Sequence, residues 1–136
     1  MRHETMPIRV GLDLVSADSV REALAAHGDR YLARVYSPGE VSDCSQETVV
    51  DAERLAARFA AKEATFKVLR VGDAAVSWRD VQVIRDPSGS VDLMLSGNAA
   101  SLAAEAGIEA MALSLSHERG LAAAVVVAEV RQPADK

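Results

Sequence analysis

The stretch RFAAKEATFKVL, residues 58–69, lies in the longest helical pattern of the chain and decides the fold. From about Thr48 to Leu69, apolar residues recur at the spacing of an amphipathic helix, and neither glycine nor proline interrupts them. Such a helix must bury its apolar side against another layer. Strand patterns precede and follow it, so we expect an α+β fold in which a mostly antiparallel sheet packs on this long helix.

Shorter patterns on either side predict the other elements. The run PIRVGLDLVS, residues 7–16, is largely apolar and predicts a strand buried on both faces. The stretch SPGE, residues 37–40, has the Ser, Pro and Glu of a capping box, although its glycine weakens this helix start. The remaining patterns predict a short helix over 21–28, a hairpin over 79–86 and 90–97, a helix over 98–107, and two strands over 108–117 and 121–130.

Composition and charge are typical of a single globular domain over residues 1–136, with frayed tails at 1–6 and 131–136. Of the 136 residues 49% are hydrophobic and 26% are charged, and the formal net charge is -5. This charge argues against general affinity for nucleic acid or an anionic membrane surface. The sequence has neither a membrane-spanning run nor a signal-peptide pattern, and the lone Cys44 excludes an intrachain disulfide. We expect a cytoplasmic protein, whose native start at Met1 or Met6 stays open.

The long helix carries an unusual set of charges for an acidic chain. From Glu53 to Arg70 it has five cations and only two anions. Glu63 and Lys67 are four residues apart and share one face of the helix, and Arg58 and Lys62 share a neighbouring face. This local excess of positive charge points to an anionic ligand that bears several phosphates. The alternative is a solvated helix face with an ion pair worth about 0.2–0.5 kcal/mol.

Asp13 lies inside the apolar run VGLDLV, residues 10–15. An ionised carboxylate is costly there unless a partner compensates it. One interpretation is a turn or capping residue beside Gly11, and the other is a metal ligand. Asp13 and Glu63 together, with phosphate oxygens and waters, would suit Mg²⁺, which binds through one or two carboxylates. A separation of 50 residues is no motif by itself.

His117 closes an apolar strand in LSLSHERG, residues 113–120. A nucleophile–base pair with Ser116 is excluded, because adjacent residues on a strand point to opposite faces. His117, with Ser116 and Arg119 nearby, could instead contact a phosphate, or it could be an exposed turn residue.

Three stretches taken together resemble the holo-[acyl carrier protein] synthase family, the small 4′-phosphopantetheinyl transferases. They are GLDLVS at 11–16, RFAAKEATFKVL at 58–69 and LSLSHERGLAAAVVVAE at 113–129, and the resemblance covers roughly residues 8–130. It implies a trimer-forming α+β fold with coenzyme A in clefts between subunits. It also implies a Mg²⁺-dependent transfer of 4′-phosphopantetheine from coenzyme A to a serine of an apo acyl or peptidyl carrier protein, which releases adenosine 3′,5′-bisphosphate.

The resemblance assigns roles to individual residues. Asp13 and Glu63 match the metal ligands, and Lys67 matches a lysine at the diphosphate; all three match catalytic positions. The positions near the coenzyme A phosphates and nucleotide are matched by Arg58, Lys62, Ser116 and His117. Glu63, directly or through a water, is the candidate base, and which carboxylate acts as base stays open.

The sequence departs from the family pattern in two places. The region of residues 16–34, where relatives present basic residues to the carrier, has as many acidic as basic residues. Arg21, Arg30 and Arg34 are the candidate carrier contacts, and a fatty acid, polyketide or peptide synthase carrier all stay open. In addition, Thr65 and Phe66 reverse the family's aromatic-then-small order. The alternatives to an active transferase are a non-catalytic carrier-protein or nucleotide-binding module and a plain structural trimer subunit.

Overall fold

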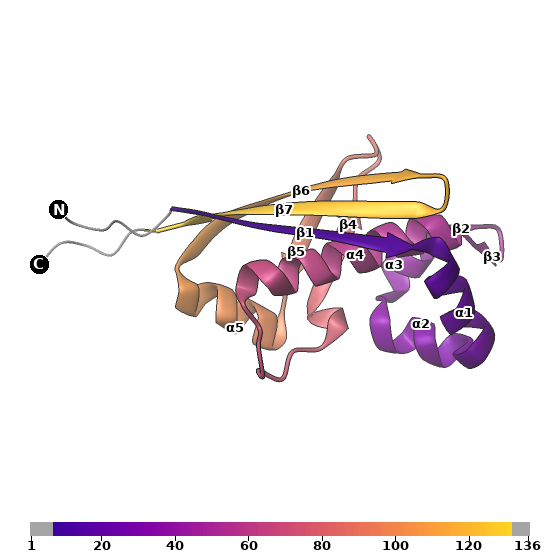
Figure 1. Ribbon diagram of the computed structural model, residues 1–136, viewed down its shortest axis with the longest axis horizontal. Coiled ribbons are helices and arrows are strands. Elements are labelled where there is room, and N and C mark those ends of the chain that lie inside the picture. The colour runs from indigo at the N-terminus through magenta and orange to yellow at the C-terminus, as the bar shows by residue number, and fades with distance from the viewer. Residues whose placement is uncertain (1–6, 132–136) are drawn as a thin grey trace, which may run out of the picture.

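The computed structural model describes residues 7–131 and has the predicted α+β architecture (Figure 1). The predicted frayed tails over 1–6 and 131–136 lie outside the described residues, apart from Arg131, and so does the choice of start at Met1 or Met6. Along the chain the elements are β1 (Ile8–Ser16), α1 (Ala17–His27), α2 (Asp29–Val35), α3 (Pro38–Asp43), β2 (Ser45–Gln46), β3 (Val49–Val50), α4 (Ala52–Leu69), η1 (Trp78–Asp80), β4 (Val81–Arg85), β5 (Val91–Leu95), α5 (Gly97–Ala106), β6 (Ile108–Glu118) and β7 (Leu121–Val130).

The main sheet has three strands in the spatial order β1-β7-β6, and both pairings are antiparallel. β4 and β5 form a separate antiparallel hairpin, as their alternating pattern predicts. Figure 1 shows that the helices lie on one side of the main sheet, with α4 running beneath it. The inner face of β7 and the alanine-rich side of α4 supply much of the core. Among the described residues, no helix has the length and apolarity that crossing a membrane requires.

The long helix begins later than its sequence pattern indicates. Asp51 caps it by accepting hydrogen bonds from the backbone N–H groups of Glu53 and Arg54, so α4 starts at Ala52 and not at Thr48. The preceding Val49 and Val50 pair with Ser45 and Gln46 in a two-residue hairpin. That hairpin, β2–β3, was not predicted, since its strands are too short to show a period.

Helix ends elsewhere follow the local signals. The capping box at the start of α3 is present, because Ser37 and Glu40 each accept a hydrogen bond from the other's backbone N–H. α5 ends at Gly107, whose φ of 77° lies in the left-handed region that favours glycine.

The prediction that β1 is buried on both faces is wrong for this chain. Only the side that faces α4 is covered. The other side exposes a row of large apolar residues, each 50–63% accessible, at Ile8, Val10, Leu12 and Leu14. The physical reason is the single-sided packing of helices on the sheet, which leaves the outer face of β1 without a covering layer from its own chain.

Candidate functional site

The first charged cluster lies where β1 passes over α4. Asp13 is on the inner face of β1, and Glu63 projects from α4 toward it. The pKa of Glu63 is raised to about 6, first because the carboxyl is partly buried and then because the negative charge of Asp13 is close. The two acids that are 50 residues apart in the sequence are therefore neighbours in the fold, as the metal-site interpretation requires.

Gly11 explains how the two acids come so close. A Cβ atom built on Gly11 would stand 2.1 Å from the carbonyl oxygen of Ala64 and 2.9 Å from a methyl of Val68. Only a residue without a side chain lets the β1 backbone approach α4 at this distance. Since Asp13 follows two residues later on the same face of the strand, the close approach delivers its carboxyl to Glu63.

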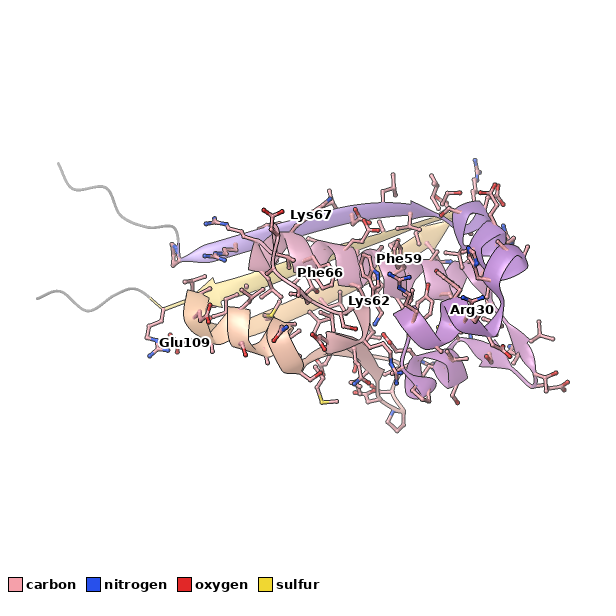
Figure 2. The ribbon with its side chains drawn as sticks, turned by 90° about the horizontal axis from the view of Figure 1, so that it is seen from below. Arg30, Phe59, Lys62, Phe66, Lys67 and Glu109 are labelled. Atoms are coloured by element: carbon pink, nitrogen blue, oxygen red, sulfur yellow. The ribbon has the colours of Figure 1, made fainter. Side chains whose placement is uncertain are left out.

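Lys67 completes this cluster one helical turn after Glu63. Its ammonium donates to Asp13 Oδ1 at 3.1 Å and to the carbonyl oxygen of Leu12 at 2.7 Å. About half of the side chain is accessible, so the ammonium can also meet a ligand. Figure 2 shows Lys67 on the side of α4 that is turned toward β1. The cluster of Asp13, Glu63 and Lys67 is called the acid pair site below.

The acid pair site fits a divalent cation. Asp13 Oδ2 is buried and has no hydrogen-bond partner, and two carboxylates that repel each other are stabilised by a shared positive ion. No group of three or more His, Cys, Asp or Glu gathers anywhere in residues 7–131. A metal here would take two protein ligands and fill its remaining positions with water and substrate oxygens, which is the habit of Mg²⁺.

A second charged cluster lines a cavity of about 450 Å³ between α4, the β4–β5 hairpin and β6. Arg54 and Arg58 enter it from α4, Arg85 from β4 and His117 from β6, and Asp43 is the single acid among its lining residues. Arg58 is only 8% accessible, and its Nε has no hydrogen-bond partner. A guanidinium that is buried and incompletely paired calls for an anion, so this arginine cavity is suited to phosphate.

A carboxylate orients His117 within the arginine cavity. Its Nδ1 lies 3.3 Å from Glu53 Oε2, and Glu53 Oε1 also accepts the backbone N–H of Gly120 in the β6–β7 turn. This contact leaves Nε2 of His117 free to meet a ligand. Ser116, which the resemblance places with His117 near the nucleotide end of coenzyme A, is not among the residues that line this cavity.

Lys62, which was expected near the phosphates of coenzyme A, points into the interior of the protein. Lys62 is fully buried, and its ammonium donates to Glu40 Oε1 at 2.8 Å and to the carbonyl oxygens of Trp78 and Val81. With all three of its donors occupied inside the protein, the ammonium has no capacity for an external anion. Figure 2 shows Lys62 beneath α4, among the packed elements.

The two clusters point in different directions from α4. Arg58 and Glu63 are five residues apart, which separates them by about 140° around the helix axis. No residue of the acid pair site lines the arginine cavity. One chain therefore presents two half-sites on opposite sides of its central helix.

A third feature is a cavity of about 430 Å³ between α1, α2 and α4. Its polar wall is formed by His27, Arg30 and Arg34, and its apolar wall by Tyr31, Val35, Phe59 and Trp78. Figure 2 shows Arg30 on the α1–α2 side of α4, on the same end as Phe59. Of the three candidate carrier contacts, Arg30 and Arg34 line this cavity, whereas Arg21 pairs with Asp18 at 2.8 Å on the surface of α1.

Trp78 lines this cavity and packs on two aromatic residues of α4. It packs against Phe59 with ring centroids 4.9 Å apart and stacks on Phe66 at 4.8 Å. Thr65 takes the buried position instead, and its hydroxyl donates to the carbonyl oxygen of Ala61. The reversed Thr–Phe order thus turns an aromatic ring outward onto Trp78.

Sequence reasoning missed several residues of these clusters. Arg54 lies four residues before Arg58, so helical spacing could have placed it in the same cavity. Arg85 carries no such signal, because only the hairpin geometry brings it to α4. Glu53 was counted as a charge of the helix but not as the partner of His117.

The chain is similar to known proteins in sequence and in fold. Residues 9–126 match the family model described as the 4′-phosphopantetheinyl transferase superfamily. Curated relatives include the holo-[acyl-carrier-protein] synthase of Desulforudis audaxviator, 42% identical over 90% of this chain and 93% of the relative. That of Chloroflexus aggregans is 43% identical over 88% of this chain and 94% of the relative.

Solved structures agree with these matches. The Chronobacterium ammoniagenes ACPS–CoA complex superposes with a TM-score of 0.78 at 31% identity, covering 93% of this chain and 99% of that one. The Helicobacter pylori holo-[acyl-carrier-protein] synthase in complex with coenzyme A gives 0.77 at 29% identity, over 89% and 100% of the two chains. The resemblance of the three sequence stretches is thereby confirmed, and the chain belongs to the holo-[acyl-carrier-protein] synthase family of the 4′-phosphopantetheinyl transferase superfamily.

Proposed function

We propose that this protein transfers 4′-phosphopantetheine from coenzyme A to a serine hydroxyl of an apo carrier protein, with Mg²⁺, and releases adenosine 3′,5′-bisphosphate. The observation that carries the proposal is the acid pair site, where Asp13, Glu63 and Lys67 meet although they come from two distant parts of the chain. A metal bound there would supply positive charge to the diphosphate of coenzyme A, held by the carboxylates of Asp13 and Glu63.

The protein's own residues supply the remaining chemistry. Phosphoryl transfer needs mainly positioning and charge stabilisation. Lys67 is placed to stabilise the negative charge that develops on the leaving bisphosphate. Glu63 is the candidate base for the serine proton, because a carboxyl with a pKa of about 6 can accept a proton near neutral pH more readily than an ordinary glutamate.

The arginine cavity is proposed to bind the nucleotide end of coenzyme A. Its three guanidinium groups and His117 face a common space with a single acid beside them. The 3′-phosphate of coenzyme A is a dianion and matches this charge, and planar guanidinium groups bind phosphate in a bidentate manner. Arg54 and Arg85 join Arg58 and His117 in this role.

We further propose that the two half-sites meet across subunits of a homotrimer. Within one chain they lie on opposite sides of α4, so one ligand molecule cannot readily reach both. The exposed apolar row of β1 continues onto Leu121 and Val127 of β7, which gives the outer face of the sheet the character of a buried interface. A subunit covering this face would bring its own half-site next to that of its neighbour.

The carrier is proposed to dock on the cavity between α1, α2 and α4. Arg30 and Arg34 supply positive charge, and the aromatic wall of Tyr31, Phe59 and Trp78 supplies apolar contact area. An amphipathic helix with acidic residues along its edge would suit both walls. The acidic residues of α1 make this surface less basic than the resemblance predicts.

The test is incubation of the protein with an apo carrier, coenzyme A and Mg²⁺, followed by mass spectrometry of the carrier. A gain of one phosphopantetheinyl group is expected. Glu63→Gln should lower turnover by about 100-fold or more, since it removes a metal ligand and the candidate base, while circular dichroism remains that of the parent. Carrier binding without any mass gain would favour the non-catalytic module, and near-parental turnover of Glu63→Gln would overturn the assignment of this residue.

A further inference from the structure

Lys62 and Glu40 form an ion pair that is enclosed on every side. Their accessible fractions are 0% and 1%, and the ammonium and carboxylate meet at 2.8 Å although the residues come from different helices. Burial lowers the pKa of Lys62 because it disfavours the ammonium, and the negative charge of Glu40 opposes that effect. A pair that costs this much desolvation is weak evidence for stability, so another role has to be considered.

The other hydrogen bonds of Lys62 lead to one place. Its ammonium donates to the carbonyl oxygen of Trp78, at 3.2 Å, and to that of Val81. These two residues belong to η1 and to the first position of β4. Lys62 thus attaches the start of the β4–β5 hairpin directly to the middle of α4.

Glu40 attaches the same hairpin from the other side. Its Oε2 accepts the backbone N–H of Val83 at 3.0 Å, and its Oε1 accepts that of Ser37 at the start of α3. The buried pair therefore connects α3, α4, η1 and β4 through charged hydrogen bonds, which are about twice as strong as neutral ones.

The hairpin matters because it forms one wall of the arginine cavity. Arg85 follows Val83 by two residues on β4, and the cavity is also lined by Ser90 of the β4–β5 turn and Val91 of β5. The opposite wall, with Arg54 and Arg58, belongs to α4. The distance between these walls decides whether guanidinium groups from both can reach one phosphate.

We infer that Lys62 and Glu40 are positioning residues that set the arginine cavity for the phosphate at the nucleotide end of coenzyme A. They hold β4 against α4, so that Arg85 and Arg58 line one cavity from its two walls. The inference rests on the proposed function of that cavity. The acid pair site is independent of it, since Glu63 faces Asp13 on a different side of α4.

The experiment compares Lys62→Met, Glu40→Gln and the double variant with the parent, using coenzyme A and 3′-dephospho-coenzyme A as substrates. Each single variant leaves one charge or carboxylate contact unsatisfied, so both should melt at lower temperature. The double variant removes both charges and should regain part of that loss. It still lacks the ammonium that donates to the carbonyl oxygens of Trp78 and Val81. The double variant should therefore not restore the parental position of β4.

We expect KM for coenzyme A to change while kcat stays nearly the same. For Lys62→Met and for the double variant, KM for coenzyme A should rise about tenfold, the effect of one misplaced charged hydrogen bond. The preference for coenzyme A over its 3′-dephospho form should fall by a similar factor. Turnover at saturating coenzyme A and KM for the carrier should stay within about threefold, because the acid pair site is unchanged.

A matched control separates positioning from stability. Val126→Ala removes buried volume from β7 at a site with 0% exposure that does not line the arginine cavity. It should lower the melting temperature while leaving the preference for the 3′-phosphate as in the parent. The same loss of preference in Val126→Ala would overturn the inference.

The remaining outcomes are also decisive. A double variant that discriminates between the two substrates as the parent does would overturn the positioning role alone. A parent that does not discriminate, together with an Arg58→Ala variant of unchanged KM, would overturn the assignment of the cavity and the inference with it. If Lys62→Met fails to fold, the double variant gives the same comparison.

Discussion

Glu63 has a pKa of about 6 because its carboxyl is partly buried beside Asp13. A folded-state pKa above the ordinary value of 4.5 means that the folded protein prefers the protonated form. The stabilising contribution of that form is complete below pH 4.5 and is lost as the pH rises through about 6. Above that range, two like charges oppose each other in the fold unless a cation compensates them.

We therefore predict a metal-dependent stability profile. In EDTA, the melting temperature of the parent should fall relative to that of Glu63→Gln as the pH is raised from 4.5 to above 6. Mg²⁺ should restore the parent at pH 7 and have little effect on the variant, whose repulsion is already removed. Differential scanning calorimetry with and without Mg²⁺ provides the measurement. A pH-independent difference between the two proteins would contradict this coupling.

Single residues also show which features one sequence makes visible and which it hides. Asp13 was recognised as a ligand candidate because a carboxylate in an apolar strand needs a partner, and that requirement is visible in the sequence. The burial of Lys62 was not predicted, because a lysine on a helix is usually exposed and its buried partner Glu40 is 22 residues away. The direction of a helical side chain depends on what packs against it, which one sequence does not show.

At the scale of elements, Gly11 controls how β1 meets α4. The backbones approach so closely that an added methyl group would overlap with Ala64. We predict that Gly11→Ala forces β1 away from α4, lowers the free energy of unfolding by about 1–3 kcal/mol, and reduces turnover through the displaced Asp13. Urea denaturation and the carrier mass assay test the two effects. Parental stability in this variant would show that the strand can adjust at no cost.

The α2 helix is the element proposed to meet the carrier. Arg30→Glu should raise KM for the carrier by about tenfold and leave KM for coenzyme A unchanged, because it reverses a charge on the docking surface only. Arg21→Glu is the matched control on α1, where the arginine is already paired with Asp18. Its effect should be smaller, and equal effects of both variants would place the docking surface across α1 as well.

Most elements could be predicted, because periodicity and caps are local signals. The exceptions have physical reasons. β2 and β3 have two residues each, which is too short for a period. β1 was predicted to be buried on both sides because its run of apolar residues indicates that both faces avoid water. The run does not indicate whether the same chain or another chain covers each face.

At the scale of the whole molecule, the outer face of the main sheet is the most unusual surface. Helices cover only the inner face, and the outer apolar row of β1 remains accessible (Figure 1). Folding of one chain therefore leaves a large hydrophobic area in water, which isolated proteins seldom do. The trimer and the cytoplasmic location stay predictions.

We predict that Leu12→Glu combined with Leu14→Glu abolishes assembly. Assembly would bury the two carboxylates in the interface without partners. The free energy of desolvating them would exceed the stabilisation from the remaining apolar contacts. Sedimentation velocity should show trimers for the parent and monomers for the variant, and turnover should be lost with the trimers because the half-sites no longer meet. A monomeric parent of full activity would show that one chain binds the whole ligand.

The exposed apolar row on β1 would make the thermal stability of the protein depend on its concentration. Where association shields that row, each subunit acts as a stabilising ligand for the others, so mass action governs the melting point. A dilute sample would then unfold at a temperature at which a concentrated sample stays folded. A cell that expresses little of this enzyme would possess a more fragile one.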